Sequence, residues 1–236
     1  MSREEVLAPT ADPEEIERRL GAISIPRAME TQRSIRRVSP DPVDDTVIRR
    51  CIELSLEAPT GSNGQNWEFI VVRDPKIRST FATQYRRAWK LYGGMGRRIA
   101  KGKPDEAQML KIIKSVQWQV DNFETIPVLV VCCLNGGHGR IPFVPSPPVA
   151  NSGHYGSIYP SVQNLLLAAR AIGLGASLIT LPLWSEMVAR RALGLPLGVE
   201  PCCIVALGWP LGRYGPKARK DVRKVIHQDT FGKLGP

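Results

Sequence analysis

Arg33-Ser34-Ile35-Arg36 is the segment that decides how the chain folds and binds, and it has two counterparts later in the sequence. These are Pro59-Thr60-Gly61-Ser62-Asn63-Gly64-Gln65-Asn66-Trp67 and, near the end of the chain, Lys217-Ala218-Arg219. A guanidinium offers paired donors, an ammonium a point charge and a serine a neutral donor, and together they suit a phosphate monoester. The pattern therefore predicts a bound phosphorylated cofactor.

The length and composition fit one layered domain with terminal arms. The chain has 236 residues, of which 43% are apolar, and this is enough for a sizeable core. Predicted helices and strands alternate along the sequence, which favours helices packed on a central sheet.

Periodicity and breaker residues give the expected elements. Helices are expected at 12–21, 43–58, 75–92, 105–121, 160–172 and 184–193, and strands at 68–73, 127–133, 176–181 and 202–207. We expect Gly93-Gly94-Met95-Gly96 to end the helix before it. The stretch from Asn135 to Gly156 is rich in Gly and Pro, so we expect a long loop there.

The net charge of +10, from 32 Lys and Arg against 22 Asp and Glu, favours anionic partners. The basic residues are spread as short pairs, which usually indicates a solvated face. Tyr85, Trp89 and Tyr92 lie among arginines, as in nucleic-acid grooves, but no zinc-finger, RNA-recognition or basic-region motif accompanies them. We therefore expect a small phosphate-bearing ligand and no nucleic-acid partner.

The cysteines and the N-terminus point to a cytoplasmic protein. Four of the five cysteines form two adjacent pairs in apolar runs, Cys132-Cys133 and Cys202-Cys203, and the members of each pair are expected to face opposite sides of a sheet. The N-terminus has no apolar signal segment. The longest apolar stretch, 164–184, carries Arg170 and glycines, so we expect no membrane span.

Several common catalytic devices are absent from the sequence. Gly173-Leu174-Gly175 begins like a dinucleotide fingerprint but lacks the third glycine, and no P-loop is present. The three histidines have no metal-ligand spacing, so we expect no metal site. No nucleophile has a base at a recognisable spacing. What remains is a site for binding, in which a bound cofactor does the chemistry.

Four segments in order resemble the nitroreductase family of FMN-dependent oxidoreductases. They are the Arg33 segment, Ala58–Phe69, Gln163–Gly175 and Ala206–Pro210 with the basic tail that follows. The resemblance implies an α+β fold, a three-layer sandwich with a mostly antiparallel central sheet and flanking helices. It also implies an intertwined homodimer with FMN at the subunit interface. The expected parts are an N-terminal arm (1–27), the FMN-binding domain (28–215) and a basic tail (216–236) that completes the cofactor site and the dimer.

The same resemblance implies which residues hold FMN. The phosphate would be bound by Arg33, Ser34, Lys217 and Arg219. Arg36 would reach the N1/O2 side of the flavin, where positive charge stabilises the reduced form. Solvated charge is the alternative interpretation of these cations.

Two further segments would line the flavin ring and ribityl chain. One is the loop from Pro59 to Gln65, which would come from the other subunit and contact the cofactor through Pro59, Thr60, Ser62, Asn63 and Gln65. The alternative interpretation of this loop is an ordinary polar turn. The other segment is Leu178, Ile179 and Thr180, which would lie behind the ring and offer a main-chain N–H to the flavin N5. The alternative interpretation is that these three residues simply belong to the core.

The implied activity is transfer of hydride from NADPH or NADH through the flavin to a nitroaromatic or quinone-like acceptor, in alternating half-reactions. The flavin N5 carries the chemistry, so no catalytic side chain is expected. Surplus arginines, namely Arg86, Arg87, Arg97 and Arg98, hint at NADPH. Alternatives are a flavin-fragmenting enzyme or reductive dehalogenase of the same superfamily, and a non-catalytic flavin or nucleic-acid binder.

Overall fold

Four antiparallel strands form the centre of the molecule. The structure, a computed structural model, describes residues 7–103, 105–136, 148–215 and 217–235. The strand order is β1-β2-β4-β3, and each neighbouring pair is antiparallel. Their bounds are Trp67–Val72 (β1), Val128–Asn135 (β2), Gly175–Ile179 (β3) and Val199–Gly208 (β4). β3 therefore lies at one edge of the sheet.

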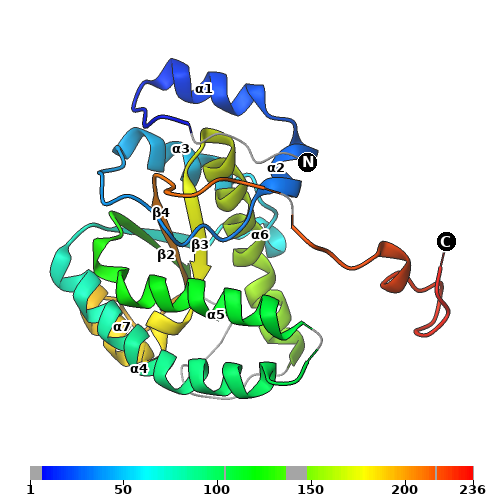
Figure 1. Cartoon of the computed structure of the whole chain (residues 1–236). Helices are drawn as coiled ribbons and strands as arrows, with labels where there is room; N and C mark the ends of the chain where they lie inside the picture. Colours follow the sequence, from blue (N-terminus) through cyan, green and yellow to red (C-terminus); the bar gives the residue numbers. More distant parts are fainter. Residues whose placement is uncertain (1–6, 104, 137–147, 216, 236) are drawn as a thin grey trace.

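Helices cover both faces of this sheet (Figure 1). One face carries α1 (Pro13–Ala22), α3 (Asp45–Ser55) and α6 (Pro148–Ile172), and the other carries α4 (Pro75–Ala100), α5 (Glu106–Asp121) and α7 (Glu186–Leu193). Side chains of β2 alternate between the two cores, with Val130 on the α6 side and Val131 on the α4 side. The expected three-layer α+β sandwich is confirmed.

The two adjacent cysteine pairs differ in how they face the sheet. Cys132 and Cys133 point into opposite cores, as expected. The register between β2 and β4 shifts at this point, so Cys132 pairs with Cys203 and Cys133 with Pro201. Cys202 is the extra residue of this bulge, and it packs with Cys203 against the same core. The prediction of opposite faces is therefore wrong for this second pair.

α4 runs through its glycines without a break, so the predicted end at Tyr92 is wrong. A Cβ on Gly93 would lie only 2.9 Å from the ring of Trp89. That ring is held in place, because its Nε1 donates to Gln117 of α5 at 2.7 Å. Gly93 thus makes room for a ring that joins the two helices, and this packing offsets its low helix propensity.

α6 begins at Pro148, which corrects the predicted loop and the predicted helix start at Pro160. Residues 148–156 are helical, whereas 137–147 lie outside the described residues. His154, Ile158, Val162 and Leu165 are buried at helical spacing on both sides of Pro160. Burial of this continuous face outweighs the one hydrogen bond that Pro160 removes.

A short helix, α2 (Ile25–Thr31), precedes the Arg33 segment, where periodicity predicts none. Ser24 caps it by accepting a hydrogen bond from the Arg27 N–H at 3.3 Å, and Pro26 stands in its first turn. α1 is confirmed and contributes the buried Ile16 to the core. Among the described helices, none is long and apolar enough to cross a membrane.

The glycines of α4 provide a matched pair of substitutions. A Cβ on Gly94 meets nothing within 4 Å, so Gly94→Ala should raise the free energy of unfolding by about 0.5–1 kcal/mol. Gly93→Ala should lower it, because the methyl group collides with the fixed Trp89 ring. Urea unfolding followed by circular dichroism measures both changes. Equal effects of the two substitutions would contradict this packing.

Candidate functional site

The Arg33 segment is fixed to the edge strand by its main chain. Ser34 forms a parallel bridge with Ala176, and the Ile35 N–H donates to the Ala176 carbonyl at 2.9 Å. The approach is close: a Cβ on Gly175 would lie 2.8 Å from Ile35. Glycine is therefore required at this crossing. Arg33 and Ser34 are consequently exposed at the beginning of the outer edge of β3.

Three cations come together at this end of β3. Partial burial lowers the pKa of Lys217, and the nearby Arg219 and Arg33 lower it further. The Lys217 ammonium also donates to the Met29 carbonyl at 2.7 Å, at the end of α2. We call Arg33, Lys217 and Arg219 the basic cluster. Cations that repel one another can share a multiply charged anion, so the basic cluster is a candidate anion site.

Arg36 points from the same segment toward α4. Its guanidinium is half-buried, and burial lowers its pKa, an effect that the nearby Tyr85 opposes and Arg33 reinforces. Burial in turn raises the pKa of Tyr85 to about 12. Arg36 thus lies near Tyr85 of α4 on one side and Arg33 of the basic cluster on the other.

The three residues Leu178, Ile179 and Thr180 lie at the other end of β3. Leu178 packs against the core on the α6 side and Ile179 belongs to the core on the α4 side, while Thr180 is exposed just beyond the strand. An edge strand presents main-chain groups outward. From Ala176 to Thr180 the strand rises roughly 13 Å. One edge thus joins the basic cluster to the Thr180 main chain.

The loop from Pro59 to Gln65 has an unusual backbone. Ser62, Asn63 and Gln65 have φ angles of 53°, 52° and 48°, in the left-handed region that costs a non-glycine residue about 1 kcal/mol or more. Local contacts hold this shape, since the Gln65 N–H donates to the Thr60 hydroxyl at 3.2 Å and the Gln65 amide donates to Asn63 at 3.1 Å. The loop residues Ser62, Asn63 and Gln65 are exposed, and Thr60 is half-buried.

α6 separates this loop from the end of β3 within one chain. Ser157 of α6 accepts the Gly61 N–H at 3.2 Å, and its carbonyl accepts the Trp67 indole N–H at 2.7 Å. Tyr155 and Tyr159 instead line a cavity of about 230 Å³ that includes Thr180. Residues two apart on a helix point about 200° apart. The structure therefore brings Arg33, Lys217 and Arg219 together but leaves the loop on the other side of α6.

The cavity beside Thr180 contains a polar group that sequence reasoning misses. The Tyr155 hydroxyl donates to Glu200 at 2.8 Å, and His154 Nε2 lies 2.9 Å from the other oxygen of this carboxylate. These contacts tie α6 to the start of β4. The helical spacing of His154 with Ile158 and Val162 is the signal that could have revealed them.

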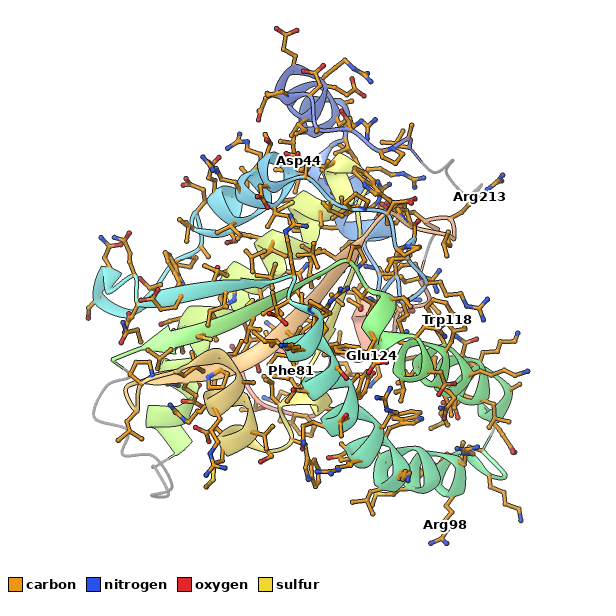
Figure 2. The ribbon with its side chains drawn as sticks, turned by 90° about the vertical axis from the view of Figure 1, so that its left-hand side faces the viewer. Asp44, Phe81, Arg98, Trp118, Glu124 and Arg213 are labelled. Atoms are coloured by element: carbon orange, nitrogen blue, oxygen red, sulfur yellow. The ribbon has the colours of Figure 1, made fainter. Side chains whose placement is uncertain are left out.

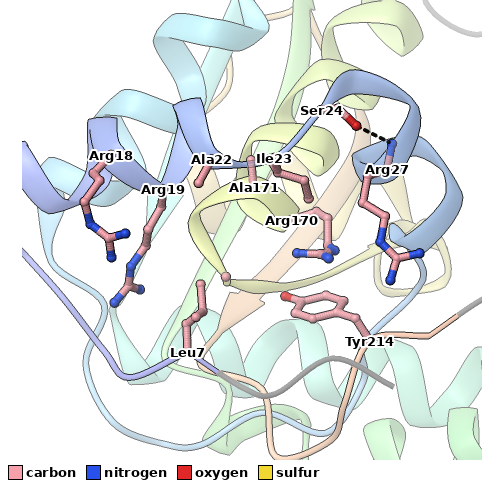
Figure 3. Close-up of a pocket in the computed structure, with 11 residues that line it drawn as sticks. Leu7, Arg18, Arg19, Ala22, Ile23, Ser24, Arg27, Arg170, Ala171 and Tyr214 are labelled. Atoms are coloured by element: carbon pink, nitrogen blue, oxygen red, sulfur yellow. Dashed lines mark hydrogen bonds between the residues drawn. The ribbon is translucent and has the colours of Figure 1, made fainter. Parts of the chain in front are cut away.

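A larger cavity, of about 570 Å³, is lined by residues of α1, α2 and the end of α6 together with Tyr214 (Figure 3). Arg170 of α6 lies in its wall, with its guanidinium 4.2 Å from the centre of the Tyr214 ring and its Nε donating to the Thr31 hydroxyl at 2.8 Å. Arg19 of α1 donates to the Ile172 carbonyl at 3.1 Å, at the end of α6. These arginines fasten α1 and α2 to α6, and Thr31 stands only two residues before Arg33.

Replacement of the buried Thr31 by Val should test this support. The change removes the acceptor of the Arg170 Nε–H, so it should lower the free energy of unfolding by about 1–3 kcal/mol. Thr83→Val is the matched control, because the Thr83 hydroxyl donates to the carbonyl four residues earlier on the surface of α4, and it should cost under about 0.5 kcal/mol. Chemical denaturation that gave similar losses for both variants would show that the Thr31 contact is dispensable.

Comparisons with known proteins identify the family and the fold of the chain. The model of the Nitroreductase family matches residues 29–209. An NADH dehydrogenase of Thermus thermophilus is 29% identical over 204 residues, which cover 83% of this chain and 91% of that protein.

Two solved structures illustrate the shared fold. A BluB-like flavoprotein from Clostridium difficile superposes with a TM-score of 0.63 at 18% identity, covering 88% of this chain and all of that one. An iodotyrosine deiodinase bound to FMN and 3-iodo-L-tyrosine superposes with a TM-score of 0.62 at 18% identity, covering 86% and 98%. At this identity the likeness concerns the fold alone.

Proposed function

Because the chain belongs to the nitroreductase family of flavin oxidoreductases, we propose that it binds FMN along the outer edge of β3 and passes electrons from NADPH or NADH to a nitroaromatic or quinone-like acceptor. The observation that carries this proposal is the placement of the basic cluster and the Thr180 main chain at the two ends of one edge strand. A phosphate and an aromatic ring joined by a ribityl chain have this extended shape.

The residues at the edge suit each part of FMN. Arg33, Lys217 and Arg219 would neutralise the phosphate, and the Ser34 hydroxyl would donate to it. Burial and then repulsion from Arg219 and Arg33 lower the pKa of Lys217, and bound phosphate would relieve the repulsion. Arg36 would supply positive charge beside the ring.

The end of β3 would support the ring itself. Leu178 and Ile179 would form a firm apolar backing, since both are anchored in the two cores. The main chain at Thr180 would face the ring from the sheet edge. When bound, FMN would supply the hydride chemistry, so the site needs no reactive thiol. Burial raises the pKa of the nearby Cys202 and keeps it an unreactive thiol.

A second copy of the chain would complete the site. The loop residues Pro59, Thr60, Ser62, Asn63 and Gln65 lie across α6 from Thr180 in their own chain, so a partner's loop is needed at the ring. The stored backbone strain of that loop is typical of ligand-binding segments. In this proposal residues 28–215 form the FMN-binding domain of each subunit.

Exposed apolar surface supports a homodimer. A hollow of about 210 Å³ beside α6 is lined by apolar residues that include Leu20, Leu54 and Leu167. The tail leaves the body of the molecule (Figure 1), and its Phe231 side chain is 93% exposed. Such surfaces are costly in water unless another subunit covers them. We assign the tail, 216–236, both to the cofactor site, through Lys217 and Arg219, and to the partner contact, and we assign the arm, 1–27, whose helix α1 packs on α6, to its own subunit.

A reductive dehalogenase or a flavin-fragmenting enzyme is the second candidate. The resemblance in the sequence leaves this alternative open, and the deiodinase shows that the fold also occurs in a dehalogenating protein. Loss of flavin absorbance under oxygen, or halide release from a halogenated phenol, would identify these activities. NADPH or NADH oxidation that depends on a nitroaromatic or quinone would identify the first candidate.

Preference for FMN over riboflavin tests the phosphate site directly. The purified protein should bind FMN at least about a hundredfold more tightly than riboflavin, because each charge-assisted hydrogen bond to phosphate contributes about 1.5–3 kcal/mol. Arg33→Gln with Arg219→Gln should remove most of that difference and leave riboflavin binding unchanged. Flavin fluorescence quenching measures all four affinities.

The control for this experiment is Arg49→Gln, an exposed arginine of α3. It removes one positive charge without touching the basic cluster and should retain the FMN preference. The proposal fails if the unmodified protein binds the two flavins equally, or if the control loses as much as the double variant.

A further inference from the structure

The hairpin of α4 and α5 carries most of the net charge of the chain. Residues 75–121 contain eleven Lys and Arg against three Asp and Glu, a net charge of +8 out of +10 for the whole protein. In the sequence these cations look like scattered pairs, but the hairpin gathers them at the end of the molecule opposite α1 and α3 (Figure 1). Such a concentration of charge favours an anionic ligand on this hairpin.

A groove of about 420 Å³ runs between the two helices, with an apolar floor and a cationic rim. Ala107, Leu110 and Ile113 form the floor. Three cations border it, namely Arg97, Lys111 and Lys114, and no carboxylate lines it in the part of the chain that the structure describes. The two lysines are one turn apart on α5, and therefore lie on the same side of the helix.

Two of the three carboxylates of the hairpin are engaged elsewhere, and the third, Asp105, does not line the groove. Glu106 accepts the Gly102 N–H at 2.8 Å, and Asp121 accepts from the amide of Gln117 at 2.8 Å. Arg97 is oriented by its own helix, since its Nε donates to the Gly93 carbonyl at 3.3 Å. The rim therefore stays positive, and its donors can meet a phosphate.

The other arginines of α4 are not placed for this role. Arg86 pairs with Glu124 at 3.1 Å, well before the groove along the helix. Arg98 stands at the outer end of α4 and points away from the body (Figure 2). Of the arginines that hint at NADPH in the sequence, Arg97 lines the groove, and α5 adds the two lysines that sequence reasoning misses.

An apolar floor beside three cations matches the adenosine end of a dinucleotide that carries an extra phosphate. A purine is flat and apolar enough for the floor, and a phosphate monoester attracts paired and point cations together. We infer that this groove binds the adenosine end of NADPH and that Arg97, Lys111 and Lys114 recognise the 2′-phosphate, which NADH lacks. The inference rests on the proposed function, and it names which of the two donors that function uses.

α5 links the groove to the edge strand that carries the proposed flavin site. Gln117 lines the groove, and Gln119, on the opposite, buried side of the helix, donates its amide to the Ser177 hydroxyl of β3 at 2.6 Å. Lys114 and Gln119 are about 7.5 Å apart along α5, and Ser177 and Thr180 about 10 Å apart along β3. A dinucleotide bound in the groove would therefore pass over the surface of α5 to bring its nicotinamide to the ring.

Calorimetric titration with 2′,5′-ADP and 5′-ADP tests the groove without any turnover. On the FMN-loaded protein, 2′,5′-ADP should bind at least about tenfold more tightly than 5′-ADP, because only the former carries the 2′-phosphate. Lys111→Gln with Lys114→Gln should abolish that difference. In steady-state kinetics the same double variant should raise the KM for NADPH about tenfold and leave the KM for NADH unchanged.

The matched control is Arg49→Gln with Lys76→Gln, which removes two exposed cations far from the groove and should keep the preference. Equal binding of the two nucleotides, no binding of either, a preference retained by the lysine variant, or a preference lost in the control would each overturn the inference. These failures leave FMN binding intact, so they differ from failure of the proposed function. If the protein bound no FMN, the same titration on the flavin-free protein would still test whether the groove prefers 2′,5′-ADP to 5′-ADP.

Discussion

The main-chain bridge between Ser34 and Ala176 is the contact on which the proposed site depends. It is possible only because Gly175 has no Cβ, and it fixes Arg33 at the start of the edge strand. Lys217, from the far end of the sequence, reaches the same place by bonding to the carbonyl of Met29. Arg170 holds α2, the helix that precedes the Arg33 segment, by donating a hydrogen bond to the Thr31 hydroxyl. These contacts hold the main chain around Arg33 and the ammonium of Lys217 in place, so less conformational entropy is left to lose when an anion binds.

α6 imposes the second constraint. It is long enough to reach from the loop anchored on Ser157 to the arginine cavity at Ile172, roughly 22 Å away. Since Ser157 and Tyr159 point in nearly opposite directions, one chain presents the loop and the end of β3 on different sides of this helix. A ligand that uses both surfaces must lie between two chains. This separation is why the proposed site includes a second copy of the chain.

Much of the fold could be predicted from the sequence, because strands, caps and the main helices leave local signals. The three-layer sandwich and the helix cap at Asp12 are of this kind. The errors arose where distant contacts override local preference: the Trp89 ring explains why α4 continues through Gly93, and a buried face explains why α6 continues through Pro160. The types of residue in the basic cluster were visible in the sequence, but their convergence depends on the sheet edge. The lysines of the α5 groove gave no signal, since only the packing of α4 on α5 makes a groove.

Subunit complementation tests the shared site most directly. One variant carries a disabled basic cluster, Arg33→Gln with Arg219→Gln, and the other a disabled loop, Ser62→Ala, Asn63→Ala and Gln65→Ala. Each alone should bind FMN weakly. If each site combines the cluster of one chain with the loop of the other, a hybrid dimer has one site with both defects and one intact site, so it should bind one FMN tightly. Hybrid dimers that bind no FMN tightly, although the unmodified dimer does, would contradict a site shared between two chains.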